Sequence, residues 1–451
     1  MKKYLQLFSL LIVLLVALNV NAQWTQVGTV PLSGTWPSIS VSSSDVCWIV
    51  GGASTPMIFR TVNGGINWYT VPVNGLQVKA LMCVWASDSL TAFVGDGGDA
   101  SGSTGGDAIA SKTTNGGQNW IQMFNTGGTA GFFNGIVFSK VNPLWGIAES
   151  DPPTGGAYYI QKTVDGGNTW FLQNPQASGS ASAQNSIVII DTNLYGFGLN
   201  STPNRIGLTT NAGVNWSFIP LTGGGTSGFI AGFTFSTDKL NGLASASTAS
   251  TTLARTTNGG TTWFSQTIPS SVTSAYPNIK WVPGLPVAYC IMSSASSTAC
   301  VKTTNNGATW TAMTFPAGTG QVNHFEIVLE GNTVYGYCVK ATGGVVYKMV
   351  DVLVGINDPN TNIPSEFKLE QNYPNPFNPV TKIDYSLPIS AFVTINVYDA
   401  LGRNVSALVS QQKSAGNHFV EFDASNLSSG VYYYTINAGN FVQTKKMMLV
   451  K

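Results

Sequence analysis

One nine-residue motif recurs six times in this sequence and constrains the fold more than any other feature. Each copy ends in a tryptophan, and the six are Trp68, Trp120, Trp170, Trp216, Trp263 and Trp310. Successive copies are 52, 50, 46, 47 and 47 residues apart. A repeat of about fifty residues, in a Gly-rich chain with little helical periodicity, is typical of a β-propeller in which each repeat forms one four-stranded blade.

Each copy of the motif is suited to a tight turn between two strands. The copies read Lys/Arg-Thr-x-Asn/Asp-Gly-Gly before the tryptophan, with departures in the fourth and sixth. The Asn or Asp positions are Asn63, Asn115, Asp165, Asn211, Asn258 and Asn305. Such side chains accept backbone N–H groups in turns, Gly tolerates a positive φ, and Trp buries a large face between neighbouring sheets. Because only Asp165 is a carboxylate, we expect these residues to build turns rather than bind metal ions.

The two ends of the repeat array complement each other. A seventh copy is due near residue 355, but residues 347–351 keep only the Lys and Asp positions. At the other end, the segment that starts at Trp24 resembles the one that starts at Trp68, yet no motif precedes it. We therefore expect the strand that contains Trp24 to complete the last blade. This gives a closed ring of seven blades over residues 23–355, without the exposed sheet edges that invite aggregation.

The first 22 residues have the pattern of a signal peptide. Lys2 and Lys3 precede an apolar run, and small residues end the segment at Ala22. This pattern predicts cleavage before Gln23 and export. No later run reaches about 18 apolar residues, so no transmembrane segment is expected after cleavage.

Export leads to an oxidising compartment, which bears on the five cysteines. An odd number excludes a fully paired set. Cys290 and Cys300 lie on two strand-like runs joined by a Ser-rich turn. They can form a disulfide across a hairpin, or they can be buried free thiols, and the sequence does not decide between the two.

The charge balance excludes several classes of function. The net charge is +1, with 21 Lys and Arg against 20 Asp and Glu, which argues against a nucleic-acid partner. Two His in the whole chain make a His-rich metal site a poor hypothesis. His324 and Glu326 are two residues apart on a predicted strand, so their side chains point to one side. We expect them to line the central channel or the core rather than to act in catalysis.

Acidic residues gather in two long loops of the second and third blades. Asp96, Asp99 and Asp107 lie in a Gly-rich stretch, and Glu149 and Asp151 begin another. We expect the five to converge on one sector of one face. Three interpretations remain open: solvated turn residues, a calcium site at Asp96, Asp99 and Asp107, or a catalytic acid and base among Asp96, Asp99, Glu149 and Asp151.

The repeated motif resembles the Asp-box, or BNR repeat, Ser/Thr-x-Asp-x-Gly-x-x-Trp. Sialidases, some xyloglucan-cleaving glycosidases, sortilin-type receptors and photosystem II assembly factor-like propellers share this box, and the spacing is most similar to the last group. The box is structural in all of them, so the resemblance implies an all-β seven-bladed propeller rather than an activity. A sialidase also needs an arginine cluster, whereas only Arg205 lies outside the repeat and the tail.

The C-terminal residues 366–451 resemble the type A sorting domain of the type IX secretion system, and residues 356–365 read as a linker. The motif residues are Asn372, Pro374, Asn375, Pro376, Phe377, Gly402, Gly430, Lys445 and Lys446. The resemblance implies an immunoglobulin-like β-sandwich that the type IX machinery recognises at the outer membrane of a Gram-negative bacterium. It also implies a protein that is secreted or attached to the outer surface.

These observations favour a non-catalytic secreted or cell-surface propeller that binds a polysaccharide or a protein. Apart from the calcium ion considered above, no cofactor is expected. The first alternative is a polysaccharide-cleaving glycoside hydrolase that uses carboxylates of the two acidic loops. The second is an assembly scaffold of the cell envelope.

Overall fold

The computed structural model describes residues 23–451 apart from short segments. The segments not described are residues 33–35, 53–54, 78–79, 99–105, 128–130, 141, 153–155, 174–180, 202, 223–227, 247–250, 271, 273–277, 317–320, 342, 354–366, 388–390, 414–415 and 439–440. The predicted signal peptide and linker therefore lie outside the described residues, as does Asp99. Within the described part every regular element is a β-strand.

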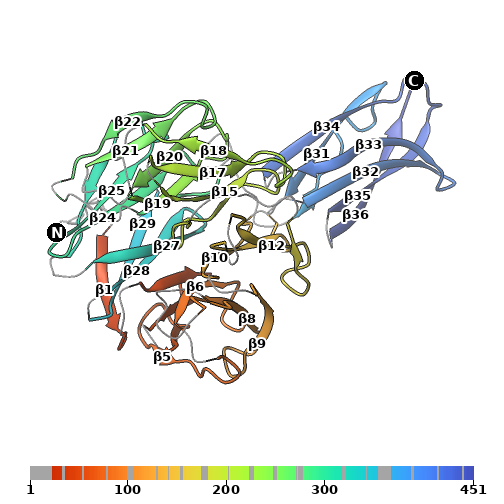
Figure 1. Ribbon diagram of the computed structural model, residues 1–451. Helices are drawn as coiled ribbons and strands as arrows, with labels where there is room; N and C mark the ends of the chain where they lie inside the picture. The colour runs from red at the N-terminus through yellow and green to blue at the C-terminus, as the bar shows by residue number, and fades with distance from the viewer. Residues whose placement is uncertain are drawn as a thin grey trace, which may run out of the picture.

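The described strands before residue 354 form seven antiparallel sheets arranged in a ring (Figure 1). Blade 1 contains β2 (Ser38–Val41), β3 (Cys47–Gly51), β4 (Met57–Thr61) and β5 (Tyr69–Thr70); blade 2 contains β6 (Leu81–Ala86), β7 (Ala92–Asp96), β8 (Ile109–Thr113) and β9 (Ile121–Asn125). Blade 3 contains β10 (Phe133–Phe138), β11 (Gly146–Ser150), β12 (Tyr159–Thr163) and β13 (Phe171–Leu172); blade 4 contains β14 (Val188–Ile189), β15 (Tyr195–Gly198), β17 (Arg205–Thr209) and β18 (Ser217–Pro220).

The remaining blades follow the same order from the inner to the outer strand. Blade 5 contains β19 (Gly228–Phe235), β20 (Gly242–Ala246), β21 (Thr252–Thr256) and β22 (Phe264–Thr267), and β16 (Asn200–Ser201) adds to its inner edge. Blade 6 contains β23 (Asn278–Trp281), β24 (Ala288–Ser293), β25 (Thr298–Thr303) and β26 (Thr311–Met313); blade 7 contains β27 (Val322–Glu330), β28 (Thr333–Lys340), β29 (Val345–Val352) and β1 (Gln23–Thr29). The predicted seven-bladed propeller is confirmed.

The ring closes through the N-terminal strand. β1 pairs antiparallel with β29, and Trp24 lies opposite Met349. The Trp24 side chain is 1% exposed, and its ring lies 5.4 Å from that of Phe315 and 6.4 Å from that of Phe325. One buried indole therefore joins the first strand of the chain to blades 6 and 7.

The repeated motif forms the same turn in all six copies. In the first, the Gly65 N–H donates to Thr61 Oγ1 at 3.0 Å, and the Asn67 N–H donates to Asn63 Oδ1 at 3.0 Å. The other five copies repeat both bonds with N···O distances of 2.9–3.1 Å. Gly65 has a φ of 91°, and a Cβ there would come within 2.8 Å of Val27. Glycine is needed at this position for its conformation and for the close approach of the N-terminal strand.

The basic residue of the motif links consecutive blades. Arg60 Nη1 of blade 1 donates to Gly116 O in the turn of blade 2 at 3.1 Å. Lys112 Nζ of blade 2 donates to Asn168 Oδ1 in the turn of blade 3 at 2.9 Å. Lys348 Nζ of blade 7 donates to Ser44 O of blade 1 at 2.7 Å, across the closure of the ring. Each of these cations therefore adds a charged hydrogen bond between two neighbouring sheets.

The C-terminal strands form two packed sheets, consistent with the predicted immunoglobulin-like sandwich. One sheet contains β30 (Lys368–Leu369), β31 (Val380–Leu387) and β34 (Gly416–Asp423); the other contains β33 (Asn404–Lys413), β32 (Ala391–Asp399), β35 (Gly430–Ala438) and β36 (Phe441–Leu449). Residues from both sheets share one buried core, including Ile383, Ile395 and Tyr434.

Two of the predicted sorting residues, Asn372 and Asn375, bond to strands of both sheets of this sandwich. The Asn372 N–H donates to Tyr434 Oη at 2.8 Å, and Asn372 Nδ2 donates to Thr381 Oγ1 at 3.0 Å. Asn375 Oδ1 accepts from the Met448 N–H at 2.9 Å. Pro374 and Pro376 lie within the same segment, Phe377 is buried, and Gly402 has a φ of 78°. Gly430 begins β35, and Lys445 and Lys446 lie on β36.

The structure decides between the two interpretations of the cysteines. Cys290 lies opposite Val301, and Cys300 lies opposite Ile291. Because the two are offset by one residue, their side chains point to opposite faces of the sheet. Of the two alternatives, the disulfide is therefore wrong and the buried free thiols agree with the structure. All five cysteines of the chain are described, and all are buried and free.

Candidate functional site

One face of the ring carries most of the long connections. On this face the inner strand of each blade begins, the second strand ends and the third begins, so blade-to-blade connections and the loops between second and third strands meet there. We call it the loop face. It contains both predicted acidic loops.

An irregular segment of blade 4 contacts the inner strands of other blades at the loop face. The inner strand β14 has only two residues, and residues 182–187 before it, here called the plug, bond to three other blades. Gln184 Nε2 donates to Trp36 O at 3.3 Å and also to Met82 O. The Asn185 N–H donates to Asn134 O at 2.7 Å. The plug therefore reaches blades 1, 2 and 3 from blade 4.

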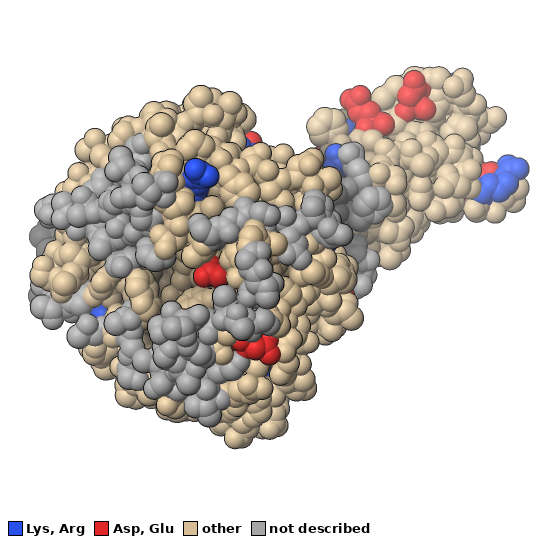
Figure 2. Space-filling model, viewed as in Figure 1, with Lys and Arg blue, Asp and Glu red and all other residues tan. Residues whose placement is uncertain are grey.

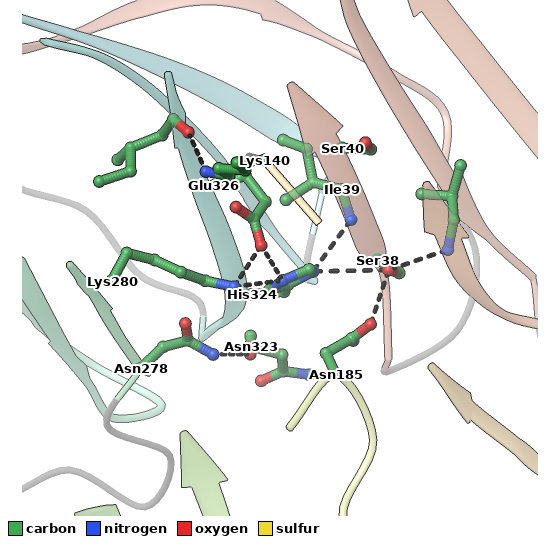
Figure 3. Close-up of polar contacts among 12 residues, drawn as sticks. Ser38, Ile39, Ser40, Lys140, Asn185, Asn278, Lys280, Asn323, His324 and Glu326 are labelled. Carbon is green, nitrogen blue, oxygen red and sulfur yellow. Dashed lines mark hydrogen bonds and ion pairs between the residues drawn. The ribbon is translucent and has the colours of Figure 1, made fainter. Parts of the chain in front are cut away.

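Below the plug, His324 and Glu326 of β27 lie in a polar network inside the channel (Figure 3). The Ile39 N–H donates to His324 Nδ1 at 3.1 Å, so the ring proton is assigned to Nε2. His324 Nε2 then donates to Glu326 Oε1 at 3.2 Å, and Lys280 forms an ion pair with the same carboxylate. Ser38 Oγ bonds to Asn185 Oδ1 at 2.8 Å and lies 3.4 Å from His324 Nδ1, which joins this network to the plug.

The electrostatics of this network favour a neutral imidazole and an ionised carboxylate. Burial lowers the pKa of His324, and the nearby charge of Lys280 lowers it further. Burial opposes ionisation of Glu326, but the charge of Lys280 and the hydrogen bond from His324 outweigh it and hold the pKa of this carboxyl well below its usual range. Lys140 Nζ donates to Ile327 O at 3.2 Å and extends the network to blade 3. The charged groups of this network thus interact with one another, as they do in a structural core.

Of the four predicted catalytic carboxylates, the structure brings Glu149 and Asp151 together. Ser182 Oγ of the plug lies 2.7 Å from Glu149 Oε1 and 3.1 Å from Asp151 Oδ1. Asn134 Nδ2 donates to Asp151 Oδ1 at 2.8 Å. Glu149 is 0% exposed. Its Oε2 atom and the buried Tyr158 hydroxyl have no hydrogen-bond partner anywhere in the described structure.

Burial dominates the protonation of this acid cluster. It raises the pKa of Glu149 well above its usual range, and the charge of Asp151 adds to the shift. Burial also raises the pKa of Asp151. A carboxyl group inside the protein holds its proton more tightly because water no longer stabilises the charge.

The predicted calcium ligands take part in separate turns. Asp96 Oδ1 accepts from the Gly98 N–H at 3.0 Å and from the Ile109 N–H at 2.8 Å. Asp107 Oδ1 accepts from the Gly127 N–H at 2.9 Å. Asp99 lies outside the described residues. Among the residues that are described, no group of three or more His, Cys, Asp or Glu side chains is placed to hold a metal ion.

Sequence reasoning missed the plug, which includes Ser182, and its partner Asn134. A signal was present, because the polar residues Ser182-Ala-Gln-Asn-Ser186 precede a short apolar run at residues 187–190, whereas blade 2 has one continuous apolar strand, Leu81–Ala86. Polar residues at the start of an inner strand mark a blade that departs from the repeat. No helix in the described part of the chain is long and apolar enough to cross a membrane.

Comparison with known proteins supports the fold and the tail. Residues 371–451 match the secretion system C-terminal sorting domain, Por_Secre_tail, which indicates type IX secretion. The chain is thus a β-propeller followed by a type IX sorting domain. No curated protein is significantly similar to it in sequence.

Solved structures that resemble the chain are distant in sequence. YCF48 bound to D1 peptide is 16% identical with a TM-score of 0.50, over 74% of this chain and 97% of that protein. An ancestral GH74 enzyme is 12% identical with a TM-score of 0.52, over 94% of this chain and 63% of the enzyme. PorZ, a type IX secretion component from Porphyromonas gingivalis, is 12% identical over 92% of this chain and 70% of PorZ, but its TM-score of 0.27 carries no argument. The first two likenesses show the propeller fold alone.

Proposed function

We propose that this protein is a non-catalytic propeller, exported through its C-terminal domain, that binds a polysaccharide or a protein at or beyond the cell surface. The chain divides in this proposal into a signal peptide (residues 1–22), a propeller (23–355), a linker (356–365) and a sorting domain (366–451). The binding surface is the loop face. The tail then serves export, and the ring serves recognition.

The burial of Glu149 carries the non-catalytic part of the proposal. A glycoside hydrolase needs an acid that touches the glycosidic oxygen and a second carboxylate across the sugar ring. Glu149 lies inside the protein, and its Oε1 atom is engaged by Ser182. Asp96 is buried as well, and two backbone N–H groups hold its Oδ1 atom. These carboxyl groups act as internal supports of the loop face.

The binding part of the proposal rests on the closed ring and on the solved structures that share its fold. The ring is locked by β1 and by the inter-blade cations, so its loops are presented on a rigid frame. YCF48 is seen with a peptide bound, and GH74 is an enzyme class, so this fold is found in both a binding protein and an enzyme.

The test is to incubate the chain from Gln23 to Lys451 with a panel of polysaccharides, with and without calcium. Retention on the polymer and the release of new reducing ends are measured together. We expect retention without product. Release of reducing ends that is lost in Glu149→Gln or Asp151→Asn would show a hydrolase instead. Recovery of the protein with an envelope protein, without retention on any polymer, would favour the assembly scaffold.

A further inference from the structure

The loop-face mouth of the channel carries an exposed tryptophan and several carboxamide side chains. Trp36 stands two residues before β2 and is 38% exposed. Its carbonyl oxygen accepts the hydrogen bond from Gln184 Nε2, so the plug lies directly beside it. Gln184 and Asn185 are both partly exposed at the tip of the plug.

Blades 6 and 7 supply further carboxamides on the same side. Asn323 of β27 is partly exposed, and the buried Asn278 of β23 positions its backbone by donating from Nδ2 to Asn323 O at 3.3 Å. Asn185 connects to them through Ser38 and His324. In Figure 3, Asn185, Asn278 and Asn323 lie on one side of His324 and Lys140 lies on the other.

Asn185 is held in a fixed position. Its φ of 59° lies in the left-handed region, which costs free energy for a residue other than glycine. The bonds from its N–H to Asn134 O and from Ser38 Oγ to its Oδ1 hold this conformation. A carboxamide held in this way has already lost the conformational freedom that a ligand would otherwise have to remove.

The described charged groups near the mouth have partners within the protein. Lys280 pairs with Glu326, and Glu149 and Asp151 bond to Ser182. Figure 2 shows that charged side chains are sparse among the described residues on the face of the ring toward the viewer. Only 9% of the whole chain is charged. Among the described residues, the mouth thus offers mainly neutral hydrogen-bond donors and acceptors.

We infer that this mouth binds a neutral polysaccharide. The indole of Trp36 stacks on the apolar face of a sugar ring, and the carboxamides of Gln184, Asn185 and Asn323 exchange hydrogen bonds with sugar hydroxyls. A carboxamide carries both a donor and an acceptor, which suits hydroxyl groups, and an indole gives a broad apolar surface. The inference rests on the proposed function and names its ligand class and its contact residues.

The experiment uses the chain from Gln23 to Lys451 and measures affinity for neutral polymers (xyloglucan, glucomannan, arabinoxylan) and acidic ones (polygalacturonate, alginate). We expect binding to at least one neutral polymer and to neither acidic one. Trp36→Ala should weaken binding at least tenfold, as truncation of a central aromatic anchor does, and Trp36→Phe should keep most of it. Asn185→Gly, which allows the same backbone conformation, should weaken binding about tenfold, the effect of losing about 1.4 kcal/mol.

The matched control is Tyr69→Ala, which removes another exposed aromatic ring from the outer strand of blade 1 and should leave affinity unchanged. Neutral-polymer binding that survives both Trp36→Ala and Asn185→Gly overturns the assigned site but leaves the proposed function standing. Binding to acidic polymers alone, or to a peptide library alone, overturns the ligand class and also leaves the proposed function standing. A folded protein that binds none of these polymers or peptides overturns both.

Discussion

Replacing Glu149 with Gln should make the propeller less sensitive to rising pH. Glu149 is fully buried, and burial raises its pKa well above the usual range. The folded state therefore keeps a proton that the unfolded chain releases near pH 4.3, the ordinary pKa of Glu. Stability from this group is complete below the unfolded pKa and is lost as the pH rises toward the folded pKa. Gln is neutral throughout and has the same shape.

The size of the effect follows from one proton. Between the two pKa values, the wild-type free energy of unfolding falls by about 1.4 kcal/mol per pH unit relative to the variant. The difference between Glu149→Gln and the wild type should therefore move in favour of Gln at this rate for each pH unit within that range. In the variant, the side-chain nitrogen of Gln takes the position of Oε2 and finds no hydrogen-bond acceptor there. This lowers the free energy of unfolding by about 1–3 kcal/mol at every pH. The slope, not the offset, is the readout.

The assay is urea unfolding of the chain from Gln23 to Lys451 at several pH values, followed by tryptophan fluorescence. Glu330→Gln is the matched control, since Glu330 is a partly exposed carboxylate of blade 7 that accepts the Ser44 N–H. It removes a charge without removing a fully buried acid, so its difference from the wild type should not follow the predicted slope. A pH-independent difference for Glu149→Gln would refute the claim that Glu149 holds its proton in the folded ring.

Three further predictions concern the ring and its thiols. Trp24→Ala should lower the free energy of unfolding of the propeller by about 3–5 kcal/mol, because the indole is buried where β1 closes the ring. Tyr69→Ala, on an outer strand, should lower it far less, and urea unfolding of the two variants measures the difference. Lys348→Met should lower the free energy of unfolding by about 1.5–3 kcal/mol in the same assay, because its bond to Ser44 O is lost. An effect near zero would show that this inter-blade cation does not stabilise the ring. A thiol reagent should count five reactive cysteines per chain after non-reducing denaturation; a count of three would restore a disulfide.

The sequence predicted the features that depend on local spacing. Thr61, Asn63 and Gly65 make their turn within five residues, so the six copies could be interpreted one by one. Ring closure was also predictable, because Trp24 resembles Trp68 and an edge strand without a partner is costly. The acidic loops could be placed on one face because each follows the second strand of its blade.

The features that depend on long-range contacts could not be predicted. The plug bonds to Trp36 and Met82, which are more than a hundred residues away. Nothing local indicates that Glu149 turns inward to Ser182 instead of outward to solvent. The sequence could not decide between a disulfide and free thiols at Cys290 and Cys300, because a register offset of one residue reverses a side chain and composition alone does not reveal register.

The plug connects the stability of the ring with its proposed binding surface. A buried acid lowers the stability of the folded ring at neutral pH, which is not expected in a protein that serves only as a scaffold. Such costs to stability are expected at functional sites. Here Glu149 and Asp151 hold Ser182, and three residues further along Asn185 presents its carboxamide at the mouth. If Glu149 serves to place the plug, Glu149→Gln should gain stability relative to the wild type as the pH rises, and it should keep affinity for a neutral polysaccharide because Gln can still accept from Ser182. Ser182→Ala, which removes that link, should lower affinity while leaving the ring folded. Equal affinity in both variants would separate the acid cluster from recognition and leave it as a purely structural contact between blades 3 and 4.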